Sequence, residues 1–186
     1  VWVLPEGYGV VQLDVLQKLP DPILERVLVR LTSVIGGKPY PPRLDRLKRA
    51  MDHIDADRIS GFTLGGCQFV AKGNAIMICR DKRAISVRMV IAGDAFVWDG
   101  VFDIEIAGPN VGMAKLAALG KKGWLEIVRD QPELIDNSVP YPVRLTLPAL
   151  FDDAGVVAVP GLEFYRGSQK NPDWAFRKLR HVASNT

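Results

Sequence analysis

The sequence predicts an α+β fold in which a helical N-terminal piece precedes mixed antiparallel strands and short helices. Two observations support this fold class. Up to residue 58 the apolar residues recur every three to four positions, as on one face of a helix. From residue 62 they alternate with polar residues, as in strands with one buried face. We therefore predict a boundary between Arg58 and Phe62, with a helical segment at 1–58 and an α+β domain at 59–186.

Two helices are predicted in the N-terminal segment. The first begins at Asp21 as N-cap, has Pro22 in its first turn, and ends at Gly36 as a left-handed stop. A second helix runs from Pro42 to about His53, after a proline-rich stretch. One stripe of this helix is apolar and is expected to point inward: Leu44, Leu47, Met51 and Ile54. A different face carries Arg43, Arg46 and Arg49.

Two hairpins are predicted next. Strands at 62–70 and 75–80 flank a turn at 72–74, and a three-residue turn would place Cys67 opposite Cys79. Two such thiols are expected to be buried apolar groups rather than a disulfide. After a further strand within 82–91, Asp99-Gly100 gives the signal for a type I′ turn at the tip of the second hairpin.

The remaining elements are short. Residues 113–119 and 123–129 are predicted as helical pieces, and 134–144, which contains two prolines, as an ordered loop. Strands at 145–151 and 155–162 are joined by a turn at 152–155. The last twenty residues are predicted to form a short helix, anchored by Trp174, Phe176 and Leu179.

The composition is that of an ordinary globular protein. The chain has 186 residues, of which 48% are hydrophobic and 24% charged, so it can bury a core. No apolar run reaches the roughly 18 to 20 residues of a membrane span, so no membrane partner is expected. Two cysteines are too few for a disulfide-stapled secreted domain, which makes a cytoplasmic location the expectation. The first residue is Val rather than Met, and we therefore expect a piece of a longer protein.

The motifs of a catalytic centre are absent from the sequence. The segment Gly108–Lys115 lacks the spacing of a phosphate-binding Walker loop, and no glycine pair extends to a dinucleotide fingerprint. The two histidines, His53 and His181, are expected on a basic helix face and in the tail, in solvated or phosphate-facing positions. We therefore predict no catalytic residue, no metal site and no cofactor within this chain.

The net charge of +3 conceals blocks of opposite sign. Residues 59–93 carry a net +4, residues 94–165 a net −6, and residues 166–186 a net +4. Clustered Lys and Arg side chains favour contact with a phosphate backbone, because each neutralised phosphate releases counterions. An ordinary solvated surface explains the same charges, and composition alone favours it over nucleic-acid contact.

Several stretches resemble the tRNA(Ile)-lysidine synthetase family. The segment Leu28–Leu47 contains Gly-Gly-Lys-Pro-Tyr-Pro-Pro-Arg, and Phe62-Thr-Leu-Gly-Gly-Cys and Cys79-Arg80 follow it. Together they resemble the region after the catalytic domain of that family. Leu119-Gly-Lys-Lys-Gly-Trp, Leu147-Pro-Ala-Leu-Phe and Val157-Ala-Val-Pro-Gly-Leu are similar to its C-terminal domain. The resemblance covers most of residues 20–165.

The resemblance implies a function for the chain. In that family an N-terminal PP-loop domain uses ATP, with Mg expected beside it, to join lysine to the wobble cytidine of an isoleucine tRNA. This sequence has no Ser-Gly-Gly-x-Asp-Ser loop, so it is expected to be the tRNA-recognition portion, inactive alone, with tRNA and the missing PP-loop domain as partners. The residues expected to bind tRNA are Arg43, Arg46, Arg49, Lys115, Lys121, Lys122 and Arg144.

Two other functions stay open. The chain could be an interaction module that docks on the catalytic domain or forms a homodimer, with little RNA contact. This alternative gains weight if the basic groups of the acidic segment do not gather on one face. An autonomous enzyme would instead require Cys67, Cys79 and His53 to converge on a metal ion.

Overall fold

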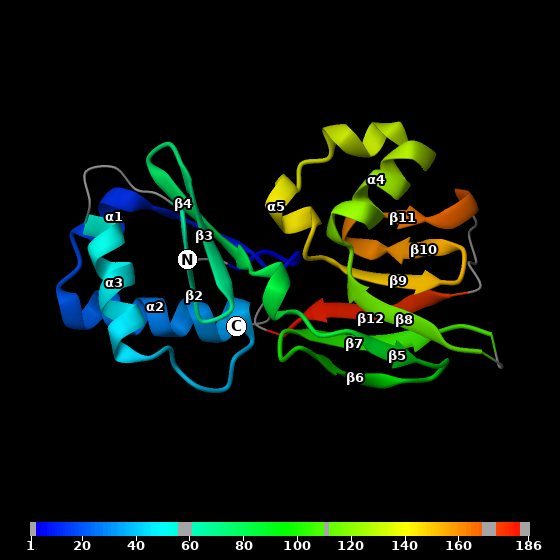
Figure 1. The fold of residues 1–186 in the computed structure, drawn as a ribbon, viewed down its shortest axis with the longest axis horizontal. Coiled ribbons are helices and arrows are strands. Elements are labelled where there is room, and N and C mark those ends of the chain that lie inside the picture. The colour runs from blue at the N-terminus through cyan, green and yellow to red at the C-terminus, as the bar shows by residue number, and fades with distance from the viewer. Residues whose placement is uncertain (1–2, 56–60, 110–111, 169–173, 183–186) are drawn as a thin grey trace.

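A computed structural model describes residues 3–55, 61–109, 112–168 and 174–182. The predicted α+β class is confirmed: a helical N-terminal piece leads into antiparallel sheets (Figure 1). The predicted boundary between residues 58 and 62 falls largely on residues 56–60, which lie outside the described residues.

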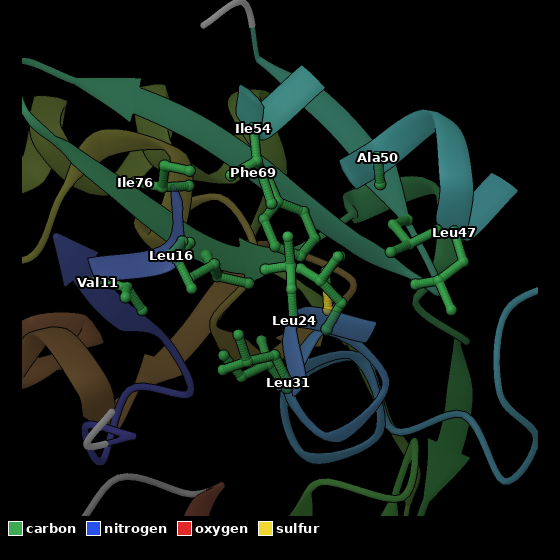
Figure 2. Close-up of a cluster of buried hydrophobic side chains, with 14 residues drawn as sticks. Val11, Leu16, Leu24, Leu31, Leu47, Ala50, Ile54, Phe69 and Ile76 are labelled. Atoms are coloured by element: carbon green, nitrogen blue, oxygen red, sulfur yellow. The ribbon is translucent and has the colours of Figure 1, made fainter. Parts of the chain in front are cut away.

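The first half of the chain is a sheet covered by helices on one face. Strand β1 (Gly9–Gln12) leads into α1 (Leu13–Gln17), α2 (Asp21–Gly36) and α3 (Leu44–Asp55). Strands β2 (Phe62–Leu64), β3 (Cys67–Lys72) and β4 (Ala75–Arg80) complete an antiparallel sheet of order β1-β4-β3-β2. The helices and this sheet share one buried core, in which Phe69 lies among side chains of all three helices (Figure 2).

Helices α2 and α3 largely match their predicted extents, with two local differences. The chain leaves α2 at Gly37, which has a φ of 67°, so the left-handed residue is Gly37 rather than the predicted Gly36. The residue before α2 is Pro20, and Asp21 already belongs to the helix. Leu44 is exposed, against prediction, because it begins α3 at the edge of the core, and Ala50 is buried with Leu47 and Ile54 instead.

The β3–β4 hairpin differs from its prediction in the turn. Lys72 pairs with Ala75, so the turn has two residues, and the predicted strand at 62–70 is interrupted at Gly65-Gly66. In this register Cys67 lies opposite Arg80 and Cys79 lies opposite Gln68. The two cysteines therefore point to opposite faces of the sheet, because Cys79 shares a face with Gln68, the neighbour of Cys67, and adjacent residues of a strand point to opposite faces.

The second half contains two more antiparallel sheets. One has the order β11-β10-β9-β8-β5 and the other β12-β7-β6. The bounds of these strands, in chain order, are β5 (Arg88–Val90), β6 (Ala95–Trp98), β7 (Phe102–Ala107), β8 (Ala114–Ala118), β9 (Pro148–Asp152), β10 (Gly155–Val159), β11 (Phe164–Tyr165) and β12 (Ala175–His181). Short 3-10 turns are Lys82–Ala84, Pro132–Asp136, Pro160–Leu162 and Arg166–Ser168.

Local turn signals predicted the hairpins of this half. Asp99 and Gly100 have φ values of 52° and 74° between β6 and β7, as a type I′ turn requires. On β7, Phe102, Ile104 and Ile106 are buried and the residues between them are partly exposed, which confirms the predicted alternation. The β9–β10 hairpin is also confirmed.

Two predicted helices are strands. Residues 114–118 form β8, which pairs with both β5 and β9, although their alanine-rich sequence favours a helix. The tail forms β12 against β7 rather than a short helix. Pairing with strands distant in sequence overrides local propensity in both places. Residues 120–130 form α4 (Gly120–Asp130), and the predicted loop at 134–144 ends in a short helix, α5 (Tyr141–Arg144).

The first sheet also packs against the second half. Met77 and Cys79 of β4 belong to a core shared with Trp124 of α4 and Val143 of α5. This sheet is therefore buried on both faces, by α1–α3 on one side and by the second half on the other (Figure 1).

Candidate nucleic-acid interface

Helix α3 carries the first group of predicted RNA-binding residues. Its apolar stripe, Leu47, Ala50 and Ile54, is buried toward the sheet. This leaves Arg46 and Arg49, with Arg43 just before the helix, exposed to solvent. Arg49 pairs with Asp45 at 3.0 Å, but both side chains are about two thirds exposed. An ion pair this exposed is weak, so Arg49 can exchange its carboxylate partner for a phosphate.

His53 lies at the far end of the same helix. Its ring stacks on Phe62 of β2 at 5.5 Å, and Phe62 stacks on the buried Phe69 at 4.5 Å. The three rings are nearly parallel. His53 is exposed, as predicted, and is held by this stack.

The proline-rich loop between α2 and α3 packs on the β2–β3 turn. A Cβ built on Gly66 would lie 3.2 Å from Cε of Lys38, and one on Gly65 would lie 3.1 Å from Cγ of Pro42. The amide of Asp81 donates a hydrogen bond to the carbonyl of Gly66 at 2.8 Å. The loop, the turn and the end of β4 therefore form one packed unit.

The β6–β7 turn, which belongs to the second half of the chain, packs against this unit. A Cβ on Gly37 would lie only 2.1 Å from the carbonyl oxygen of Asp99, so the end of α2 and this turn meet at a distance that only glycine allows. The Asp99 carboxylate accepts a hydrogen bond from Nη2 of Arg80 at 2.5 Å and further ones from the amide and hydroxyl of Ser86. Arg80 is 2% exposed and lies over the ring of Trp98.

Charge at this junction is balanced by the Arg80–Asp99 pair. Burial is the largest single influence on the pKa of Asp99 and raises it. The hydrogen bonds from Ser86 and Arg80 together outweigh burial and hold this pKa below its ordinary value. Asp99 is therefore an ionised partner that neutralises a buried guanidinium, and it presents little free negative charge to a ligand.

The second group of predicted residues surrounds α4. Lys115 and Lys122 both line a groove of about 560 Å³ between β8, β9 and the start of α4. Nζ of Lys115 lies 4.7 Å from the centre of the Phe151 ring, within the range of a cation–π contact. Lys121 is exposed beside Lys122. These three lysines therefore gather on one part of the surface.

Three carboxylates lie in the same groove, but two of them are engaged. Asp152 forms an ion pair with Arg166 at 2.9 Å. Glu126 accepts a hydrogen bond from the amide of Val156 at 2.6 Å. Asp153 is exposed at the β9–β10 turn. The groove is thus mixed in charge, and its phosphate-binding capacity depends on the lysines at its rim.

Arg144 lies away from the surface, unlike the other six predicted residues. It is 9% exposed and its guanidinium lies 4.7 Å from the ring of Trp124. Four backbone carbonyls accept hydrogen bonds from it, those of Leu134, Ile135, Asn137 and Val139, at 2.5 to 3.3 Å. Arg144 therefore holds the loop before α5 in place, and a phosphate could reach it only if these bonds broke.

His181 also departs from its prediction. It lies in β12 rather than in a solvated tail, is fully buried, and meets the edge of Phe102 at 5.3 Å. Burial, with a smaller contribution from the charge of Arg80, lowers its pKa to about 4. The imidazole is therefore neutral at physiological pH and cannot serve as a cationic phosphate contact.

The cysteines do not form a reactive or metal-binding centre. Both are free and buried, in different cores, and burial raises the pKa of each thiol to about 12. Within the described ranges no group of three His, Cys, Asp or Glu side chains could hold a metal ion. Nor is any helix of the described residues long and apolar enough to cross a membrane. The requirement set above for an autonomous metalloenzyme is not met by Cys67 and Cys79.

Two curated proteins are similar to this chain. A tRNA(Ile)-lysidine synthase of Ruegeria pomeroyi is 32% identical over 142 residues, which are 76% of this chain and 32% of the relative. A tRNA(Ile)-lysidine synthase of Rhizobium meliloti is 27% identical over 97 residues, or 52% of this chain and 21% of the relative. The chain is homologous to part of the tRNA(Ile)-lysidine synthases. It spans about a third or less of the length of these relatives.

Two other comparisons gave no match. No family model and no solved structure matches the chain. The link to the tRNA(Ile)-lysidine synthases therefore comes from the two relatives, and it confirms the resemblance found in the sequence.

Those stretches of the lysidine synthase resemblance that lie in the first half of the chain converge in space. The Gly-Gly-Lys-Pro-Tyr-Pro-Pro-Arg loop, the Gly65-Gly66 turn and Arg80 all belong to the packed unit between the halves. The sequence did not predict the partner of Arg80. Asp99 lies 19 residues away, and the Asp99-Gly100 pair indicates only a turn, not an ion pair with a distant residue. An arginine directly after a run of buried strand residues was the available signal.

Proposed function

We propose that this chain is the tRNA-recognition portion of a tRNA(Ile)-lysidine synthetase. The homology to tRNA(Ile)-lysidine synthases is the observation that carries the proposal. The exposed arginines on α3 and lysines around α4 give it a physical basis. Folded RNA is bound largely through backbone geometry and phosphates, which rigidly mounted basic side chains contact.

The basic residues form two separate groups. Figure 1 shows α3 at one end of the molecule and α4 with β8 toward the other. An RNA that contacts both must extend across the molecule, as a folded tRNA does. The proposed contact residues are Arg43, Arg46 and Arg49 in one group and Lys115, Lys121 and Lys122 in the other.

The chemistry of lysidine formation is assigned to another part of the parent protein. ATP, Mg and lysine are proposed to bind the PP-loop domain, whose nucleotide loop is absent from this sequence. We expect the 186-residue chain alone to bind tRNA without modifying it, in the cytoplasm where tRNA is processed.

Salt dependence of binding tests the proposal. The chain and an isoleucine tRNA are titrated by fluorescence anisotropy between about 50 and 200 mM salt. Six phosphate contacts predict an affinity loss of roughly a thousandfold over this range, and three contacts a loss of about 40-fold. The double change Arg43→Gln with Arg46→Gln should weaken binding. It should also reduce the slope of log affinity against log salt concentration by the amount expected for the loss of about two phosphate contacts.

A matched change elsewhere gives the control. Lys72 is exposed at the tip of the β3–β4 hairpin, outside both groups, so Lys72→Gln should leave affinity nearly unchanged. Binding that is insensitive to salt, or equal losses in the arginine and Lys72 variants, would contradict the proposal.

A second candidate function is protein docking, and exposed apolar side chains on β5 favour it. Met89 lies in this edge strand and Val87 and Ile91 flank it, and all three are more than half exposed. In this second function the exposed apolar surface is buried against the catalytic domain or against a second copy of the chain. Sedimentation velocity should then show a dimer that Met89→Lys dissociates, with tRNA affinity unaffected; a monomer at all concentrations would exclude the homodimer.

A further inference from the structure

Tyr40 is unusually exposed for an aromatic residue. Its side chain is 81% accessible, more than any other large hydrophobic side chain in the described residues. It lies at the middle of the loop that joins α2 to α3, and this loop projects at the lower edge of Figure 1. Leaving a phenol ring in water forgoes the stabilisation that burial provides, so the fold itself gives no reason for this position.

The loop holds Tyr40 in a restricted position. Pro39, Pro41 and Pro42 surround it and fix three φ angles. The stem of Lys38 packs on Gly66 and the ring of Pro42 packs on Gly65, so the loop is anchored on both sides of the tyrosine. A ring presented in this way loses little conformational entropy when a partner covers it.

The charge around Tyr40 is positive. Residues 36–44 include Lys38 and Arg43 and no carboxylate. Lys82 is exposed on the 3-10 turn that follows β4, next to the Gly66 contact. The acids closest along the chain and at the junction each have a basic partner: Asp45 pairs with Arg49, Asp81 with Arg83 and Asp99 with Arg80. The setting therefore suits an aromatic ligand that carries phosphates.

We propose that Tyr40 is a stacking site for an unpaired base of the bound RNA. The site rests on the proposed function and specifies the kind of RNA contact. Paired bases are covered by their neighbours in a duplex, so only a base in a loop, bulge or end offers a free face to the ring. Lys38 and Arg43 would bind the phosphates on either side of that base.

Two RNAs with equal numbers of nucleotides test the site. One is a blunt hairpin, and the other has a shorter stem with a four-nucleotide single-stranded 3′ end. Both are closed by the same compact tetraloop, whose bases stack on one another and leave no free face for the ring. Tyr40→Ala in the 186-residue chain should weaken binding of the extended RNA by about 5- to 150-fold, the range for loss of one stacked base. Binding of the blunt hairpin should change less than about twofold.

Three further variants separate stacking from other causes. Tyr40→Phe keeps the ring and should bind like wild type, whereas Tyr40→Leu keeps an apolar side chain without the ring and should bind like Tyr40→Ala. Leu44→Ala removes the neighbouring side chain, which is 57% exposed, and should have no effect. Equal losses on both RNAs, or full affinity in Tyr40→Leu, would overturn the stacking site and assign the loop to another contact.

The two proposals fail in different ways. If wild type binds neither RNA nor isoleucine tRNA, the proposed function falls and the stacking site falls with it. If wild type binds with the expected salt dependence, but Tyr40→Ala binds each RNA as tightly as wild type does, only the stacking site is overturned.

Discussion

The Arg80–Asp99 pair is where single side chains matter most for stability. Arg80 is almost completely buried, so removing the negative charge of Asp99 would leave an uncompensated buried cation. Asp99→Asn keeps the size and tolerates the positive φ, and we expect it to reduce the free energy of unfolding by about 3 to 5 kcal/mol. Urea denaturation measures this loss.

An exposed ion pair provides the comparison. Asp14 of α1 and Lys18, the residue that follows this helix, are 3.3 Å apart in solvent, so Lys18→Gln should leave the unfolding free energy nearly unchanged. Replacing Arg80 by Met together with Asp99→Asn removes the buried charge and should recover part of the loss. If Asp99→Asn lowers the free energy of unfolding as little as Lys18→Gln does, the Arg80–Asp99 pair does not stabilise the fold.

His181 makes stability depend on pH. Its folded pKa of about 4 lies below the ordinary value of 6.5, so the unfolded chain binds the proton more readily. Stability is therefore complete above pH 6.5 and falls as the pH drops toward 4, by up to about 3 kcal/mol. Asp99 has a lowered pKa as a carboxyl group, so its contribution is lost only below about pH 4.

Urea denaturation at pH 7.5, 6 and 5 checks this dependence. His181→Phe can keep the edge contact with Phe102 while removing the titrating group, so its stability should change much less over the same range. A variant with the same slope as wild type would show that other groups cause the pH dependence.

At the scale of elements, the close approach of α2 to the β6–β7 turn can be tested with two glycines. Gly37 and Gly73 both have left-handed φ values, 67° and 59°. A Cβ on Gly73 meets nothing within 4 Å, whereas one on Gly37 would collide with the Asp99 carbonyl. Gly73→Ala should cost about 1 to 2 kcal/mol, from backbone strain alone, and Gly37→Ala at least twice as much.

Urea midpoints of the two alanine variants give the answer directly. Similar losses would mean that the turn can move away from α2 at little cost, and that the two halves are not held at this point.

The sequence predicted those elements whose signals are local. Helix α2 has an apolar face with Gly37 beyond its end, and Asp99-Gly100 specifies its own turn. Strands β8 and β12 were missed because their formation depends on partners far along the chain. The same distinction holds for the site: exposed arginines on α3 were identified from helical spacing, whereas the burial of Arg144 depends on a loop that folds over it.

The whole molecule should unfold as one cooperative unit. The first sheet shares a core with each half, and the Arg80–Asp99 pair and the Gly37 contact add to the junction. Calorimetry should show one transition with equal calorimetric and van't Hoff enthalpies. The described tryptophans, Trp98, Trp124 and Trp174, all report on the second half, and their fluorescence midpoint should coincide with the calorimetric one.

Two separate transitions would contradict this expectation. They would indicate that the halves are independent domains, with the boundary between them after β4 (Ala75–Arg80).

The opposite orientations of Cys67 and Cys79 provide a native pair of chemical reporters. Cys67 lies in the core beneath the helices, and Cys79 lies between the halves. Their raised pKa values keep both thiols unreactive in the folded state, so alkylation by iodoacetamide records opening events. Equal modification rates in mild urea would mean that both cores open together, and faster modification of Cys79 would mean that the halves separate first.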